Sequence, residues 1–197
     1  MIDYIKIVAE SFDYDYLLYN SGLDFERKYN VVTSEIEMNE YGTTKITSTY
    51  KGMQFVVKES LNESKRLIVT GSLHKFWNNG EHNYDDFGFN ELYATIHHLS
   101  DILKVSPKNF TIHNLEFGVN IVPPIASSRV LKGLLIHKGL AFKNHSEYDA
   151  DYYQVKHTNY IIKIYNKAKQ FRSLLLEDKD ILRIEIKQTR MNDIKEV

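Results

Sequence analysis

The feature that most constrains this fold is a two-residue alternation of apolar and polar side chains that returns in separate parts of the chain. Neighbouring side chains of a β-strand point to opposite faces, so such a segment makes one apolar and one polar face. The clearest cases span residues 65–76, 112–122, 161–170 and 181–187. Amphipathic strands of this kind predict an antiparallel sheet with one face on the core and the other face polar.

The remaining elements fit the same architecture. Further strands are expected at 2–9, 31–38, 45–50, 52–57 and 152–157, the last forming a hairpin with 159–167. One helix is expected at 90–104, and a second runs from a cap at Ser127 or Ser128 to about His137. Residues 11–29 and 171–180 read as irregular or weakly helical, and 78–86 as a loop. The pattern predicts an α+β domain, an antiparallel sheet with helices packed on one face.

Length and composition narrow the class of protein. A chain of 197 residues fits a single domain, and no linker divides it. It has no cysteine, which excludes disulfides, thiolate catalysis and cysteine-based zinc sites. We find no apolar run long enough for a membrane span and no secretory signal, so we expect a cytoplasmic protein without a membrane partner.

The net charge of −1 hides an asymmetry along the chain. Residues 1–120 carry 11 Lys and Arg against 17 Asp and Glu, a net charge of −6, whereas residues 121–197 carry 14 against 9, a net of +5. A local positive field in the last third could hold a phosphate backbone, although a chance fluctuation of charge gives the same count.

Tyr165 lies in this basic part of the chain, and it is the candidate nucleophile. On an extended strand it shares a face with Lys163 and Lys167. Two ammonium groups beside a phenol favour the phenolate and can neutralise a phosphate, as a nucleophile that attacks a phosphodiester requires. The chain holds fourteen tyrosines, however, and most tyrosines in any protein serve packing.

The same polar face offers candidate metal ligands. If the alternating strands are neighbours, Glu116, Glu185 and His74 join Tyr165 there. Carboxylates with an imidazole suit a hard divalent cation, Mg²⁺ or Mn²⁺. The alternative is that each of these side chains is simply solvated.

Four blocks of sequence, in order over residues 65–191, carry a resemblance to a known family. They are Gly71-Ser72-Leu73-His74-Lys75-Phe76 with Gly80-Glu81-His82-Asn83, then Leu115-Glu116-Phe117-Gly118-Val119-Asn120, Ile164-Tyr165-Asn166-Lys167-Ala168-Lys169-Gln170, and Leu182-Arg183-Ile184-Glu185-Ile186. The set resembles the phage and plasmid replication initiation proteins of the gene II/X type, which are similar to the Rep_trans rolling-circle initiators.

This resemblance implies a fold similar to the HUH endonucleases and a nicking and joining reaction. Such enzymes cut one DNA strand at an origin, keep a 5′-phosphotyrosine link and leave a free 3′-hydroxyl. The family's Tyr-x-Lys motif falls on Tyr165 and Lys167, and its metal-binding acids fall on Glu116 and Glu185.

The resemblance also implies partners and further contacts. Single-stranded or supercoiled origin DNA is the expected partner, and the family leaves room for a homodimer and for a host helicase. We expect Lys75, Lys163, Lys169 and Arg183 to contact the DNA. We also expect the chain to be the N-terminal, catalytic part of a longer protein.

Some positions depart from the family pattern. Gln170 stands where many members have a glutamate, Asn120 where related strands often have an aspartate, and the expected His-x-His pair is missing. Two alternatives therefore stay open: a conjugative relaxase or transposase of the same chemistry, and a catalytically silent DNA-binding domain.

Overall fold

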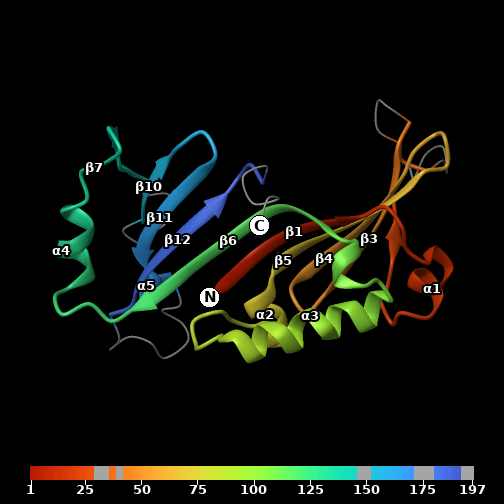
Figure 1. The fold of residues 1–197 in the computed structure, drawn as a ribbon, viewed down its shortest axis with the longest axis horizontal. Helices are drawn as coiled ribbons and strands as arrows, with labels where there is room; N and C mark the ends of the chain where they lie inside the picture. The colour runs from red at the N-terminus through yellow and green to blue at the C-terminus, as the bar shows by residue number, and fades with distance from the viewer. Residues whose placement is uncertain (29–35, 39–41, 146–151, 171–179, 192–197) are drawn as a thin grey trace. The chain divides into compact units, whose positions relative to one another are not determined.

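The computed structural model describes residues 1–28, 36–38, 42–145, 152–170 and 180–191. The chain forms two compact units, residues 3–113 and residues 114–197 together with Met1 and Ile2. Each unit is built on antiparallel strands with few helices, which confirms the predicted α+β class (Figure 1). The assignment of the whole chain to one nicking domain stays a prediction.

The sheet of the first unit has the strand order β2-β3-β4-β5-β1, and each neighbouring pair is antiparallel. Its strands largely follow the predicted segments, because β-branched and aromatic residues alternate there with polar ones. They are β1 (Ile2–Ala9), β2 (Glu26–Arg27), β3 (Thr44–Tyr50), β4 (Met53–Glu59) and β5 (Lys65–Ser72).

One face of this sheet forms the core of the unit. The register places Phe55 opposite Val69, and Val57 opposite Leu67, with all four side chains almost fully buried. The helices cover this face and add Leu17, Leu73 and Leu103 to the core (Figure 1). The helical segments are α1 (Tyr14–Tyr19), α2 (Leu73–Trp77), α3 (Phe89–Leu103) and the short 3-10 helix η1 (Pro107–Asn109).

Helix α3 confirms the prediction for residues 90–104, whereas the prediction of a strand through residue 76 is wrong. Strand β5 ends at Ser72, whose hydroxyl accepts a hydrogen bond from the backbone N of Lys75 and so caps α2. His74 and Lys75 are therefore helical residues, and the apolar-polar alternation beyond Ser72 is a coincidence of composition.

The sheet of the second unit has the order β6-β12-β11-β10-β9, again antiparallel throughout. The hairpin prediction is confirmed, with its tip at residues 157–159. The strands are β6 (Thr111–Ile121, in this unit from Asn114), β9 (Lys143–Asn144), β10 (Tyr152–Lys156), β11 (Tyr160–Asn166) and β12 (Leu182–Gln188); β7 (Ile136–His137) and β8 (Leu140–Ala141) pair separately.

Helix α4 (Ser127–Lys132) packs on the apolar face of β11 and β12, where Leu131 contacts Ile164 and Leu182. On the same face of β6, Phe117, Val119 and Ile121 stay exposed. The helix is shorter than predicted, because Gly133 ends it and residues 136–137 are extended. Its first amide is capped by Asp180, which accepts a hydrogen bond of 2.6 Å from the backbone N of Ser127. The predicted cap by a serine side chain of the helix itself is therefore wrong.

The strand predicted through residue 170 also ends early. Asn166 is the last residue of β11, and its side-chain oxygen accepts a hydrogen bond of 3.0 Å from the backbone N of Lys169. This contact caps α5 (Lys167–Gln170), so Lys167 and Lys169 lie on a helical turn.

Some predictions lie wholly or partly outside the described residues. They concern most of the strand at 31–38 and the segment 171–180, of which only Asp180 is described. Among the helices that the structure describes, none has the length and apolar character needed to cross a bilayer.

Candidate active site around Tyr165

The polar face of the second sheet gathers the candidate site. Antiparallel register sets Tyr165 opposite Arg183, and Lys163 opposite Glu185. Along each central strand every second side chain lies on this face, as predicted for Glu116, Tyr165 and Glu185. The face comprises Tyr152 and Gln154 of β10, Lys163 and Tyr165 of β11, Arg183, Glu185 and Lys187 of β12, and Glu116, Gly118 and Asn120 of β6.

Tyr165 and Glu185 are in direct contact. The Tyr165 hydroxyl donates a hydrogen bond of 3.0 Å to Glu185 Oε1, and both residues are buried, with 7% and 4% of their surface exposed. A carboxylate at this distance can accept the phenolic proton. The strands thus provide a tyrosine with a base in place, although the two residues are twenty positions apart.

Lys163 links the carboxylate of Glu116 to that of Glu185. The ammonium of Lys163 lies 2.9 Å from Glu116 Oε2 and 3.9 Å from Glu185 Oε2, so it stands between the two acids. Lys187 binds the other oxygen of Glu116 at 2.8 Å. Lys163, predicted to contact DNA, bridges the two candidate metal ligands in this arrangement.

Two further predicted residues lie beside Tyr165. Arg183 is fully buried, and its Nε lies 2.5 Å from Glu185 Oε1. Lys167 is almost fully buried, with its ammonium 5.7 Å from the centre of the Tyr165 ring. This geometry is a cation–π contact between the ammonium and the ring.

The part of the polar face around Tyr165 is buried, whereas Tyr152, Lys163 and Lys187 on the same face stay partly exposed. Tyr165, Lys167, Arg183 and Glu185 are all buried. Alternation determines which face a side chain occupies, but it carries no information on what covers that face. Burial of Arg183 and Glu185 is tolerable because they form an ion pair and Glu185 also accepts the hydrogen bond from Tyr165.

Tyr152 is a second phenol at this site, and no motif of the sequence marks it as a site residue. It lies opposite Tyr165, with 5.5 Å between the ring centres. Burial, with smaller effects from the charges of Glu185 and Glu116, raises the pKa of Tyr152 to about 12. The predicted hairpin carried part of the signal, because equal counting along both strands from the midpoint between residues 158 and 159 pairs position 152 with 165.

Gly118 was also not recognised as a site residue. It lies opposite Glu185, and a Cβ built at this glycine would fall 2.2 Å from the backbone oxygen of Ile184 and 3.1 Å from Glu185 Cγ. A side chain at this position would displace Glu185 or the strand that carries it. Glycine is therefore required for the close approach of β6 and β12.

His74 and Lys75 lie in the other compact unit, on α2. His74 is fully buried, stacks on Phe87 with 4.8 Å between ring centres, and its Nε2 lies 2.6 Å from Asp85 Oδ1. Burial alone would raise the pKa of Asp85, but the hydrogen bonds from Asn78 and His74 outweigh it and hold that pKa below its usual value. The described contacts of His74 are those of a core residue.

The donor set of the site suits a hard cation in part. No group of three or more His, Cys, Asp or Glu side chains that could hold a metal occurs among the described residues. The Lys163 ammonium nevertheless marks a cation position between Glu116 and Glu185. Mg²⁺ is commonly bound by one or two carboxylates that are completed by water and substrate phosphates, so these two acids fit such an ion if Lys163 moves aside.

Comparisons with models of known protein families and with curated proteins find no match to this chain.

Proposed function

We propose that this chain is a rolling-circle replication initiator, a tyrosine DNA nickase and ligase with a fold similar to the HUH endonucleases. The observation that carries the proposal is the hydrogen bond from the Tyr165 hydroxyl to Glu185 Oε1. Of the two phenols at the site, Tyr165 has a carboxylate in proton-transfer reach, whereas the hydroxyl of Tyr152 donates to the amide oxygen of Gln154 at 3.3 Å. A phenol with a base is an activated nucleophile.

In the proposed reaction, Tyr165 Oη attacks a phosphorus of single-stranded origin DNA. The Oη–P bond forms, the P–O3′ bond breaks, and the phenolic proton passes to Glu185. The departing 3′-oxygen takes up a proton and becomes the free 3′-hydroxyl. Since the 5′-phosphotyrosine preserves a phosphodiester, attack by a 3′-hydroxyl reverses the step and rejoins the strand.

The basic residues have defined tasks in this scheme. Lys167 stabilises the developing phenolate from beside the ring. Arg183 orients Glu185 through their ion pair. Lys163 sits where its ammonium can leave Glu116 and meet a non-bridging phosphate oxygen as DNA enters.

Glu116 and Glu185 would hold the divalent ion that the resemblance implies. When bound, such an ion polarises the phosphate and stabilises negative charge on its oxygens. Entry of the ion requires Lys163 to give up both acids, so cation binding and release of Lys163 toward the phosphate are coupled.

A second candidate is a catalytically silent DNA-binding domain, and the burial of the site favours it. With Tyr165, Arg183 and Glu185 buried, the ion-paired face also fits a purely structural role. The two candidates differ in one outcome, the formation of a covalent bond to DNA.

The test is capture of that bond. The protein is incubated with Mn²⁺ and a labelled library of single-stranded oligonucleotides with randomised centres, then denatured and resolved by size. We expect a labelled protein band in the parent that is lost in Tyr165→Phe. Tyr160→Phe is the matched control on the same strand, and it should keep the band. An adduct that persists in Tyr165→Phe would contradict the assignment, and no adduct in the parent would favour the silent domain.

A further inference from the structure

A row of basic side chains crosses the first unit on the face opposite its core. Lys45 of β3 lies opposite Lys58 of β4, which lies opposite Arg66 of β5. Their chain neighbours Ile46, Val57 and Leu67 are buried on the other face. Three exposed cations are therefore aligned across adjacent strands.

This arrangement costs stability in the free protein. Like charges directly opposite one another on neighbouring strands repel. Within the described part of the chain, neither Lys45 nor Lys58 forms an ion pair, and Arg66 pairs only with Glu10, at 2.9 Å between two largely exposed side chains. An exposed pair of this kind contributes little. Packing does not explain the row, whereas a bound anion would.

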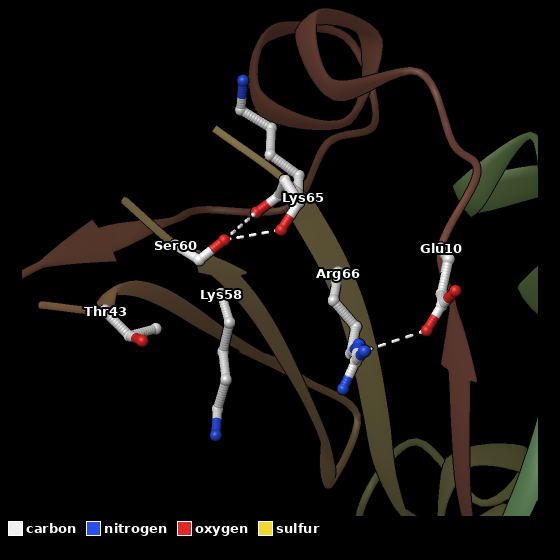
Figure 2. Close-up of a pocket in the computed structure, with 7 residues that line it drawn as sticks. Glu10, Thr43, Lys58, Ser60, Lys65 and Arg66 are labelled. Carbon is white, nitrogen blue, oxygen red and sulfur yellow. Dashed lines mark hydrogen bonds and ion pairs between the residues drawn. The ribbon is translucent and has the colours of Figure 1, made fainter. Parts of the chain in front are cut away.

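The row borders a polar hollow of about 560 Å³, within the range of small-ligand sites. Lys58 and Arg66 extend from neighbouring strands in the same direction, and Thr43 lies beside Lys58 (Figure 2). Ser60 and Ser64 add hydroxyls from the turn between β4 and β5. Lys65 and the Glu10 carboxylate complete the lining. Once a phosphate replaces Glu10 on Arg66, the ammonium, guanidinium and hydroxyl donors match its oxygens.

We propose that this basic row, Lys45, Lys58 and Arg66, binds the phosphodiester backbone of single-stranded DNA. Cations repeated along a line fit a chain of phosphates better than a single one. The choice of single-stranded DNA rests on the proposed function. The contact is electrostatic and carries no sequence preference, because only backbone groups are engaged.

The test measures binding of a fluorescent oligothymidylate by anisotropy as a function of salt, in the Tyr165→Phe background with EDTA so that no reaction occurs. Each lost phosphate contact reduces the slope of log K against log salt by about 0.7 for a single strand. We expect the double variant Lys45→Gln/Lys58→Gln to bind more weakly and to lose about 1.4 of that slope.

The matched control is Lys104→Gln/Lys108→Gln, which removes two exposed charges of the same unit that lie outside the strands of the row. It should keep the parental slope. An equal slope in both double variants, or no binding of oligothymidylate by the parent, overturns the proposal. Competition by free thymidine monophosphate provides a second check. If it displaces the probe as well as the unlabelled oligomer does at equal phosphate concentration, the site binds single phosphates and the proposal is overturned.

This result is independent of nicking. The adduct assay tests Tyr165 in the other unit, so a reduced slope without an adduct would keep the DNA-binding row and reject the nickase. An adduct together with an unchanged slope would keep the nickase and reject the DNA-binding row. Because the substitutions remove repulsion at exposed positions, the urea midpoint of Lys45→Gln/Lys58→Gln should not fall, which separates loss of binding from loss of folding.

Discussion

Gly118 of β6 and Glu185 of β12 face each other so closely that a Cβ at position 118 would lie 2.2 Å from the backbone oxygen of the residue before Glu185. We expect Gly118→Ala to destabilise the fold by about 1–3 kcal/mol, because β12 must shift to admit the methyl group. Urea denaturation measures this. Gly133→Ala is the control, since its Cβ would come no closer than 3.3 Å to its neighbours. Equal effects of the two substitutions would contradict the close approach of the strands.

Tyr152 should titrate far above an ordinary tyrosine. Its folded-state pKa of about 12 lies above the usual 10.0, so its contribution to stability is fully present below pH 10 and is lost as the pH rises from 10 toward 12. Ultraviolet absorbance of phenolate follows the titration, and Tyr152→Phe should remove a step at a pH of about 12. Glu185→Gln should lower the pKa of Tyr152, because it removes one of the charges that raise it. An unchanged titration in Tyr152→Phe would contradict this environment.

Lys163 should compete with a divalent cation for Glu116 and Glu185. Removing the ammonium leaves two carboxylates facing one position, so we expect Lys163→Met to bind Mn²⁺ at least about ten-fold more tightly than the parent, a gain of about 1.4 kcal/mol. Electron paramagnetic resonance counts the free ion. Lys156→Met, an exposed lysine on β10, is the matched control. Equal or weaker affinity in Lys163→Met would mean that these acids do not form a cation site.

Asp85 should stabilise the first unit through His74. Asp85→Ala removes the acceptor that His74 Nε2 meets inside the fold, and we expect a loss of about 1–3 kcal/mol. Asp86→Ala changes the exposed neighbour and should have little effect. Since the folded-state pKa of Asp85 lies below its usual 3.8, its contribution is present above that pH and is lost as the pH falls through the folded-state value. Denaturation curves over this acidic range check the sign.

The sequence predicted the strands of the site well, because apolar and polar residues alternate through positions 114–121 of β6, 162–165 of β11 and 182–187 of β12. The prediction of strand ends was wrong where a polar side chain caps a helical turn. Ser72 follows the alternation of its strand and Asn166 falls on the apolar face of β11, and each caps the helical turn that follows. His74 and Lys167 were therefore assigned to strands.

The pairing of charges could not be predicted either. Lys163 was expected to meet DNA, but strand order brings Glu116 to within 2.9 Å of it. That order depends on contacts between segments far apart in the chain, which local periodicity does not encode. Coverage of the polar face is likewise a tertiary property.

The most direct test of the central claim is peptide mapping by mass spectrometry of the covalent adduct formed with Mn²⁺ and single-stranded DNA. We expect the phosphonucleotide to be attached to Tyr165 through its hydroxyl oxygen, and Glu185→Gln to form much less adduct because the proton acceptor is gone. Attachment to Tyr152, to Tyr160 or to any residue of the first unit would contradict it.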